Sequence, residues 1–518
     1  MPDRTHGDAA LNAARRARDL AAATADDTVD LVVIGGGFTG VGVALDAVTR
    51  GLSVVLIERG DLASGTSSWS SKLAHGGLRY LAKLDFSIAW ESALERGRLM
   101  GRIAPHLIRP LPLVMPLHSG VGRLDAAMFG IGFFAGDVLR RLARTPASLL
   151  PRPSRVSAAA VREQVPAADA EGLRGGLLSW DGQLIDDARL VVALARTAAV
   201  HGARIITYAE ATDIEPGQVG FVDELTGDRH TVRAKQIVNA TGVWADTLAD
   251  EVELAPSKGS HLLVRAERLG DPEVAITAPV PGHFGRFVFA VPWHEGLVMV
   301  GLTDSPHHGA VPDRAMPDDE DLDFLLATIN TALAEPLALD DIVGSYAGFR
   351  PLLKTSGSSS ADLSRRHALL RDPRTDALTI VGGKLTEYRR MAEDAVDAVV
   401  EGGGLTAGPS RTKSLGLVGI GTPDPNLPEA LIRRYGTDAA SVAAYAESDP
   451  TLGGPVRTGI PYSGAEVRFA VDHELAITVD DVIDRRSRWG LVEADRADFA
   501  SAVRRLAPEL IVNTQEEG

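Results

Sequence analysis

The sequence predicts an α/β fold, in which a discontinuous Rossmann-like nucleotide-binding domain carries an inserted α+β substrate domain and a helical C-terminal domain. The first observation is a strand at 30–34, a helical spacing at 40–50 and a second strand at 52–57, which together form a β-α-β unit. The second is a pair of later apolar runs, at 236–239 and 378–381, each leading into a Gly-containing turn. Because these segments are far apart in the chain, we expect one sheet assembled from separated pieces.

The turn after the first strand has the spacing of a dinucleotide-binding motif. In the pattern G-x-G-x-x-G, Gly35 permits a tight turn, Gly37 lets the backbone approach a pyrophosphate, and Gly40 lets helix and strand pack closely. The phosphates then face a helix N-terminus that carries roughly half a unit of positive charge. Glu58 ends the second strand, 23 residues after Gly35, close to the spacing of about 20 for a carboxylate that binds a ribose.

The remaining segments suggest how the chain is divided. A charged, Ala-rich stretch at 8–23 predicts a surface helix, and Pro- and Gly-rich sequence at 402–409 and 419–428 predicts a linker. Beyond the linker, 427–447 and 465–506 have the pattern of helices. We predict a helical extension over 1–28, a nucleotide-binding domain from 29–105, 181–255 and 349–400, a substrate domain from 106–180 and 256–348, and a helical C-terminal domain over 401–518.

Composition excludes several classes of function. The 518 residues carry a net charge of −16, which argues against nucleic-acid binding, because that requires positive charge to displace counterions. The chain has no cysteine, so disulfides, thiolate zinc sites and iron–sulfur clusters are excluded, and we predict no metal site. We find no secretory signal and no apolar window of the roughly 18 residues that a spanning helix needs.

The glycine motif alone fits NAD and FAD equally. A second helix N-terminus late in the chain, at 382–386, is what the longer FAD needs near its ribityl chain and ring oxygens. Several motifs then resemble, in order, those of the FAD-dependent respiratory glycerol-3-phosphate dehydrogenases. They are Thr66-Ser-Ser-Trp-Ser-Ser-Lys-Leu-Ala-His-Gly-Gly-Leu-Arg-Tyr80, Asp186 to Leu190, Lys258 to His261, Gly301 to Asp304, Gly348 to Leu352, Gly382 to Arg389, and the tail from Ala465 to Arg486.

The resemblance implies non-covalent FAD and a fold like that of D-amino-acid and glycine oxidases. The missing cysteine agrees with this, since a thioether-linked flavin is excluded. The resemblance and the glycine motif together place the cofactor-binding residues at Gly35, Gly37, Phe38, Thr39, Gly40, Glu58, Thr66, Ser67, Ser68, Ser71, Lys72, Leu73, His75, Gly76, Gly77, Ala211, Ala240, Thr241, Gly242, Trp244, Gly383, Lys384, Leu385 and Thr386.

The implied substrate is glycerol 3-phosphate, which would be oxidised to dihydroxyacetone phosphate. Its dianionic phosphate needs several fixed cations, for which Arg is best suited. We expect substrate contacts from Arg79, Tyr80, Arg350, Arg365 and Lys384, with Arg350 also catalytic. A structural ion pair is the alternative for each arginine.

Alcohol oxidation also needs a base for the hydroxyl proton, while the flavin N5 takes the hydride. His261 is the candidate, because histidine titrates near neutral pH and this one precedes an apolar strand. His75 and an Arg-stabilised alkoxide compete for the role, and a structural histidine in a strand is the remaining alternative.

Electrons must leave the reduced flavin. The resemblance implies a quinone acceptor and a peripheral protein at the cytoplasmic face of the inner membrane. Residues 128–144 combine apolar side chains with Arg140, Arg141 and Arg144, a pattern of helices at anionic lipid surfaces, although an ordinary packed helix is equally consistent. Residues 485–488 are interpreted as a solvated helix face or a docking site for lipid or a partner subunit, and a homodimer stays open.

Three rival functions remain at this point. An oxidase could use oxygen with the same substrate, and an amine or amino-acid oxidase could share the fold. A non-catalytic flavin-binding protein is the third, but it would have no need for the Arg, His and Lys side chains at the flavin-facing motifs.

Overall fold

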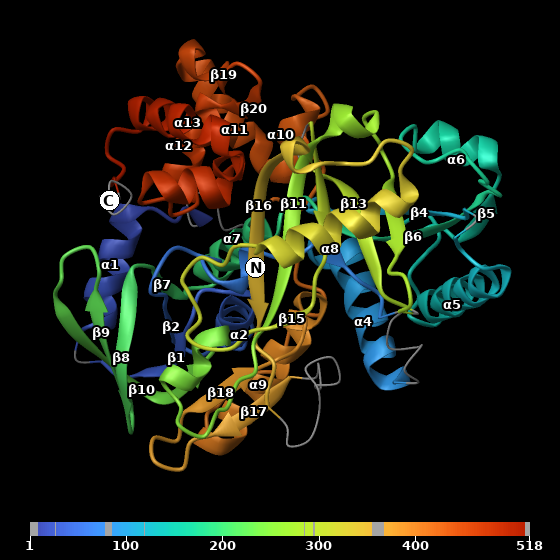
Figure 1. The fold of residues 1–518 in the computed structure, drawn as a ribbon. Coiled ribbons are helices and arrows are strands. Elements are labelled where there is room, and N and C mark those ends of the chain that lie inside the picture. The colour runs from blue at the N-terminus through green and yellow to red at the C-terminus, as the bar shows by residue number, and fades with distance from the viewer. Residues whose placement is uncertain are drawn as a thin grey trace.

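The computed structural model describes residues 9–25, 27–77, 85–118, 120–283, 285–293, 296–354 and 367–512. In these residues two large sheets lie side by side, and the C-terminal helices cover one end of both (Figure 1). None of the helices in these ranges is both long and apolar enough to cross a bilayer. The predicted substrate-contact residues Arg79, Tyr80 and Arg365 lie outside the described residues.

The first sheet is the predicted nucleotide-binding sheet. Its central strands are parallel, and an antiparallel strand closes one edge. In spatial order its main strands are β17 (Ala368–Arg371), β18 (Leu378–Val381), β10 (Arg229–Asn239), β1 (Val29–Ile34), β2 (Val54–Ile57) and β7 (Arg204–Ile206), and a hairpin of β8 (Ala209–Glu215) and β9 (Gln218–Asp223) extends from β10. Strands from three distant parts of the sequence therefore make one sheet, as predicted.

Alternating side chains of β1 explain why this sheet is covered on both faces. Leu31 and Val33 face one hydrophobic cluster, whereas Val32 and Ile34 face another. Helices fill the first cluster: α2 (Phe38–Thr49), α7 (Asp187–Val200) and α9 (Tyr388–Gly403). The second cluster is closed by α1 (Ala13–Ala23) and the β8–β9 hairpin.

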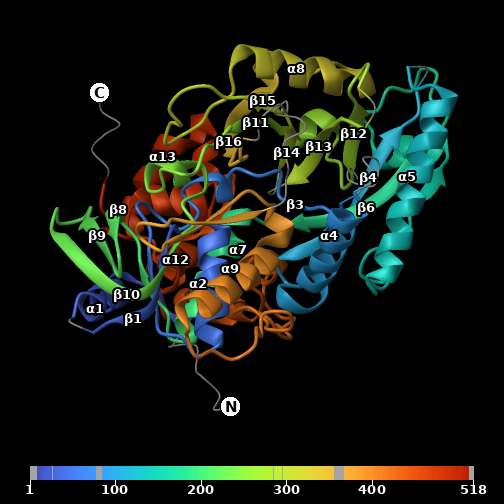
Figure 2. The same ribbon diagram turned by 90° about the horizontal axis from the view of Figure 1, so that it is seen from below.

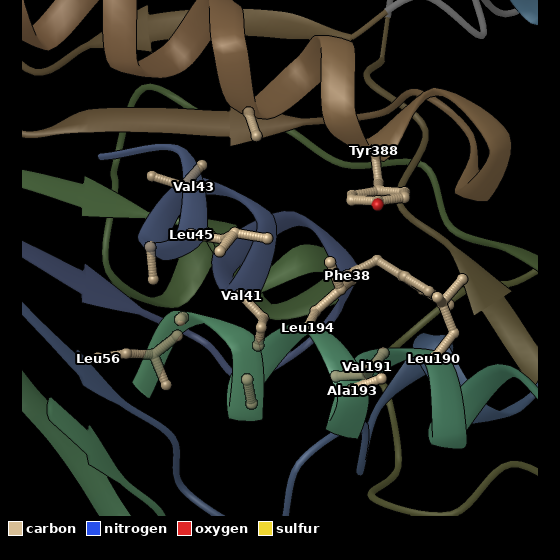
Figure 3. Close-up of a cluster of buried hydrophobic side chains, with 14 of the residues drawn as sticks. Phe38, Val41, Val43, Leu45, Leu56, Leu190, Val191, Ala193, Leu194 and Tyr388 are labelled. Atoms are coloured by element: carbon tan, nitrogen blue, oxygen red, sulfur yellow. The ribbon is translucent and has the colours of Figure 1, made fainter. Parts of the chain in front are cut away.

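Helix α2 is held between α7 and α9 (Figure 3). Phe38, its first residue, approaches Tyr388 of α9 with ring centroids 6.0 Å apart. A Cβ atom at Gly42 would lie 3.1 Å from the Tyr388 ring, so the absence of a side chain there lets α9 pack close. Each fully buried Val or Leu in this cluster contributes roughly 1.5–3 kcal/mol, which fixes the start of α2 firmly.

Helix α1 differs from its predicted extent. It begins at Ala13, where the side chain of Asn12 accepts a hydrogen bond from the Arg15 amide, the usual geometry of an N-cap. It is not simply a surface helix, because buried Arg16 pairs with Asp223 at 2.7 Å and so ties α1 to the β8–β9 hairpin.

The second sheet belongs to the predicted substrate-domain segments and is mixed. Its strands are β15 (Ser305–Pro306), β11 (Ser257–Arg265), β14 (Leu297–Gly301), β13 (Phe287–Trp293), β12 (Ala275–Pro279), β4 (Ile108–Pro116), β6 (Gly176–Leu184) and β3 (Leu73–Ala74), with β16 (Ile342–Arg350) paired to β11 and β5 (Ser154–Val156) to β6. The predicted boundary between 180 and 181 falls inside β6, and the division into domains stays a prediction.

Strand β11 divides its side chains between the two faces of this sheet. Leu262 and Val264 join the cluster covered by α8 (Asp319–Ile329), whereas Leu263 joins a cluster that contains Tyr346 on the opposite face. The period of two places His261 on the same face as Leu263. This face looks away from α8 and towards the segment that follows β2.

Two helices, α4 (Phe86–Arg98) and α5 (Arg123–Leu142), lie next to one another at one edge of the molecule (Figures 1 and 2). A short π-helical turn, Leu99–Ile103, follows α4, and α6 (Ala158–Gln164) lies beyond α5. The buried side of α5 is anchored by Phe129, whose ring lies 5.3 Å from that of Phe287.

The C-terminal region contains shorter helices than the sequence predicted. It contains α10 (Glu429–Tyr435), α11 (Ala439–Ser448), a hairpin of β19 (Pro455–Arg457) and β20 (Ile460–Ser463), α12 (Gly464–His473), a π-helical turn (Asp481–Arg486) and α13 (Glu493–Leu506). The predicted helix at 427–447 is interrupted at Gly436, and that at 465–506 at Leu475, because both residues have a positive φ that ends a helix, +59° and +58° respectively.

The interpretation of 485–488 as a solvated face is wrong. Arg486 and Arg488 are fully buried, and Arg485 is nearly so. Arg485 and Arg486 both pair with buried Asp61, at 2.5 and 2.7 Å. Sequence alone could not pair these arginines with a carboxylate more than 400 positions away, and the cluster instead joins the C-terminal helices to the first sheet.

Candidate active site

The glycine-rich turn closes a tight cradle at the N-terminus of α2. Gly35 has φ +113°, and a Cβ atom there would lie 2.5 Å from the Ala240 carbonyl oxygen. A Cβ atom at Gly40 would lie 2.0 Å from the Gly35 carbonyl oxygen. Gly37 is the N-cap and supplies no side chain to the helix end. Only glycine fits at Gly35 and Gly40, where a Cβ atom would meet backbone atoms, and this close packing is typical of a pyrophosphate site at a helix N-terminus.

Glu58 lies beside this cradle, where a ribose-binding carboxylate was predicted. The carboxylate of this half-buried residue accepts hydrogen bonds from the amides of Gly36 at 2.5 Å and Gly60 at 2.8 Å. Burial raises the pKa of Glu58, while these two amides oppose the rise by favouring the ionised form. The carboxylate is therefore fixed in orientation against the turn.

Other predicted cofactor residues lie on strands of the first sheet or on the turns that follow them. Ala240 and Thr241 follow β10 next to Gly35. The Trp244 ring packs on Gly65, where a Cβ atom would be 2.8 Å away. Ala211 lies on β8, and Gly383, Leu385 and Thr386 begin the turn that leads into α9. The glycine cradle, the N-terminus of α2 and the half-buried Glu58 together fit FAD.

One segment connects this cradle to the second sheet. The Ser67 hydroxyl accepts a hydrogen bond from the Phe38 amide at 3.0 Å, at the first turn of α2. The Thr66 hydroxyl donates to the Phe349 carbonyl of β16 at 2.6 Å. Four residues after Ser67, the hydroxyl of Ser71 is 2.9 Å from Nε2 of His261. The family-like motif at 66–72 therefore runs from the nucleotide cradle to the candidate base.

His261 is fully buried in a space that neighbouring glycines provide. Its ring stacks on Tyr346 with centroids 4.6 Å apart. A Cβ atom at Gly301, its partner on β14, would lie 2.2 Å from Cδ2 of the imidazole. Nδ1 has no hydrogen-bond partner within the described part of the chain. Burial, followed by the positive charges of Lys72 and Arg350, holds the pKa of His261 well below its usual value, so the ring is neutral.

Arg350 lies at the end of β16, over Gly259 of β11, where a Cβ atom would be 2.6 Å from its guanidinium. It pairs with Asp304 at 3.2 Å and donates to the carbonyl of Thr303 at 3.2 Å. The ion pair considered from sequence therefore exists. It orients the guanidinium while about a fifth of the side chain, 22%, stays exposed.

Two other predicted residues have their own partners. Lys384 donates to Glu387 at 2.8 Å and to the Ser92 hydroxyl at 3.0 Å. His75 is 49% exposed and its Nδ1 is 2.8 Å from Asp181. Gly76 lies against Arg96, which also binds Asp181. The geometry thus favours His261 over His75 as the buried neutral base.

Sequence reasoning missed three residues around His261. Asp187 was given no role, Arg488 was assigned to a solvated or docking surface, and Tyr346 was not singled out. The signal that could have found Asp187 was its place in the family-like run 186–190. Tyr346 and Arg488 give no such signal, because only the folded sheet and the C-terminal turn bring them to Ser70 and Ser68.

Comparison with known proteins agrees with this geometry. A family model described as FAD dependent oxidoreductase matches residues 30–383, and one described as the C-terminal domain of alpha-glycerophosphate oxidase matches 373–514. The protein is thus an FAD-dependent oxidoreductase, and the predicted cofactor and fold class are confirmed.

Individual relatives show which family of FAD-dependent oxidoreductases the chain belongs to. The chain is 49% identical over 500 residues, covering 94% of it and 96% of the relative, to glycerol-3-phosphate dehydrogenase 1 of Mycobacterium bovis. The solved glycerol-3-phosphate dehydrogenase from Bacillus halodurans, complexed with FAD, is 27% identical with a TM-score of 0.74, covering 98% of this chain and 95% of that one. The chain belongs to the FAD-dependent glycerol-3-phosphate dehydrogenase family. L-alpha-glycerophosphate oxidase from Mycoplasma pneumoniae, 18% identical with a TM-score of 0.56 over 76% of this chain and 99% of that one, shares the fold.

Proposed function

We propose that the protein oxidises sn-glycerol 3-phosphate to dihydroxyacetone phosphate, with FAD accepting the hydride. The observation that carries this assignment is the continuous segment 66–72, which bonds to the α2 N-terminus at Ser67 and to buried His261 at Ser71. The glycine turn Gly35–Gly40 would hold the pyrophosphate of FAD, residues of this segment would hold the rest of the cofactor, and FAD would supply the hydride acceptor.

In this site His261 accepts the C2 hydroxyl proton. The base must be neutral to do so, and the low pKa of His261 keeps it neutral at physiological pH. In the tautomer where Nε2 donates its hydrogen to Ser71, the Nδ1 lone pair has no competing bond among the described residues. The His261 ring is fully buried under Tyr346, and exclusion of water favours this proton transfer.

Cationic side chains bind the phosphate and stabilise the developing alkoxide. Among the described substrate candidates, Arg350 is the one whose positive charge lowers the pKa of His261. Asp304 and Thr303 fix the guanidinium so that binding costs little side-chain entropy. Lys384, Arg79, Tyr80 and Arg365 complete the proposed substrate contacts.

Anaerobic stopped-flow mixing of the purified flavoprotein with glycerol 3-phosphate tests the assignment. Bleaching of the oxidised flavin absorbance is expected at millimolar substrate, whereas glycerol, which lacks the phosphate, should bleach it far more slowly. An unreduced flavin at saturating glycerol 3-phosphate would contradict the proposal.

A quinone is the proposed electron acceptor. The alternative acceptor is oxygen, and the C-terminal match to the alpha-glycerophosphate oxidase domain favours keeping it as a second candidate. Steady-state turnover with a soluble quinone analogue, compared with peroxide production in air, separates the two. We expect quinone turnover to exceed peroxide formation, and the reverse ratio would identify an oxidase.

We further propose that α5 docks on the cytoplasmic face of the membrane. Large apolar side chains stand on its outer side, with Leu124 74%, Ile131 69% and Phe134 62% exposed. The whole chain has a net charge of −16, yet residues 123–155 contain six arginines and two aspartates. A net positive segment with exposed apolar side chains fits an anionic lipid surface.

Replacing Ile131 and Phe134 together by Asp is expected to weaken binding to anionic vesicles at least about tenfold, because two buried apolar side chains are lost from the bilayer. Vesicle co-sedimentation measures it. The matched control is Leu339→Asp, which charges a similarly exposed apolar residue elsewhere, 57% exposed, and should not change binding. Equal binding by the double variant and the native protein would refute docking through α5.

A further inference from the structure

A buried charge cluster lies directly behind Ser71 and His261. Lys72 is fully buried, and its ammonium donates to the Asp187 carboxylate at 2.9 Å and to the Ser68 carbonyl at 2.8 Å. The aromatic rings of Trp293 and Tyr346 lie 5.3 and 4.8 Å from the ammonium. The Lys72 side chain is therefore committed to the protein itself.

The C-terminal region contributes the second cation of this cluster. Arg488, which follows the π-helical turn Asp481–Arg486, pairs with Asp186 at 3.2 Å and Asp187 at 3.7 Å. It also donates to the Ser68 carbonyl, and its guanidinium lies 5.0 Å from the Trp69 ring. Two buried cations thus face two buried carboxylates, which balances the charge of the cluster.

Both residues flanking Ser71 are tied to this cluster. Asp187 accepts hydrogen bonds from the Ser70 amide at 3.0 Å and hydroxyl at 2.7 Å. The Ser70 hydroxyl in turn accepts from the Lys72 amide at 3.0 Å. On the other side, the Tyr346 hydroxyl donates to the Ser70 carbonyl at 2.9 Å while its ring stacks on His261. Ser71 and His261 are held by the same group of residues.

The backbone is also constrained there. Lys72 has φ +57° and Arg488 has φ +68°, conformations that non-glycine residues rarely adopt. Such strain persists only where the surroundings enforce it, and it concentrates at functional sites. Here the enforcing contacts are those of the cluster.

We propose that Lys72, Asp187 and Arg488 are positioning residues for the reaction, which fix the Ser71–His261 pair and set the charge around the imidazole. The C-terminal region thereby reaches the catalytic centre through Arg488. This inference rests on His261 being the base of the proposed function.

The charges around His261 define the expected pH behaviour. Two cations act on the imidazole, Lys72 and Arg350, and Arg350 is paired with Asp304. The phenol of Tyr346 stacks on the imidazole. The remaining charged groups of the cluster lie on the far side of Tyr346 and Lys72, and they are Asp186, Asp187 and Arg488. Burial lowers the pKa of Lys72 to about 8, and Asp187 limits that fall, so Lys72 is mostly charged at neutral pH. Removing this cation removes one cause of the low pKa of His261, so the pKa of His261 should rise.

The test measures flavin reduction by glycerol 3-phosphate over about pH 5 to 9, bracketing the usual histidine pKa of about 6.5. In the native protein the rate should stay level as pH falls, until well below that value, because only then is His261 protonated. In Lys72→Met the same loss should begin at least about one pH unit higher, with a maximal rate at least tenfold lower. If folded, FAD-containing Lys72→Met protein loses its rate at the same low pH as the native protein, the inference is overturned.

A second variant, Arg488→Lys, keeps the positive charge but loses the guanidinium contacts to the carbonyls of Ser68 and Asp484. This variant tests the inference if Lys72→Met does not bind FAD. We expect kcat to fall at least tenfold with KM for glycerol 3-phosphate and the acid limb unchanged. A native kcat in this variant overturns the inference.

The matched control is Arg196→Lys, since Arg196 is also buried and also joins α7 to the C-terminal region, through Asp438 at 2.7 Å. It should leave kcat and the pH profile unchanged, and a loss equal to that of Arg488→Lys would mark a merely structural role. Failure of glycerol 3-phosphate to reduce the native flavin would instead contradict the proposed function itself.

Discussion

Replacing His261 by Asn is expected to slow flavin reduction by glycerol 3-phosphate about 10²–10⁴-fold, the usual contribution of a general base. The reason is that no other described histidine combines full burial with a contact to the segment 66–72. Asn is polar and smaller than the imidazole, so the space next to Gly301 accommodates it, and it lacks a basic ring nitrogen. Stopped-flow reduction at saturating substrate measures the effect.

FAD content and melting temperature should stay near native in the His261→Asn protein, which separates lost chemistry from lost folding. His308→Asn, at an exposed histidine, is the control and should reduce at the native rate. If His261→Asn reduces its flavin within a few-fold of the native rate, the Arg-stabilised alkoxide, the competing proposal, becomes the better account.

Replacing Gly40 by Ala is expected to abolish stable FAD binding and to destabilise the protein by about 1–3 kcal/mol or more, the usual cost of overpacking. The added Cβ atom would meet the Gly35 carbonyl oxygen at 2.0 Å. That atom belongs to the backbone, so relief requires α2 to move away from the pyrophosphate cradle. The flavin absorbance of the purified protein and its unfolding midpoint in urea measure the two effects.

The matched control is Gly130→Ala, since Gly130 is also a helical glycine but a Cβ atom there meets nothing within 4 Å. This change should raise stability by roughly 0.5–1 kcal/mol, because Ala loses less backbone entropy in a helix than Gly does. Yellow, fully loaded Gly40→Ala protein would show that the cradle tolerates a side chain and would undermine the assigned cofactor site.

The helical tail shows the limit of local patterns. Apolar spacing at 427–447 and 465–506 predicted long helices, but turns at Gly436 and Leu475 interrupt them. These turns are stabilised by tertiary contacts: the Leu475 amide bonds to the Leu11 carbonyl at 2.8 Å. A sequence window contains no information about such a partner, so helix length was overestimated.

The sequence by itself determined the nucleotide-binding sheet, because strand, glycine turn and acid are local features with a defined spacing. It also determined FAD and the family, through the late helix N-terminus at 382–386 and the ordered motifs that resemble those of the family. It also placed His261 and Arg350 in motifs. Tertiary structure decided which side chains share one environment. Arg486 and Arg488 look like a solvated basic face in the sequence, yet they are buried against carboxylates from distant segments. The physical reason is that a charge can be buried only beside an opposite charge, and only the folded chain brings those partners together.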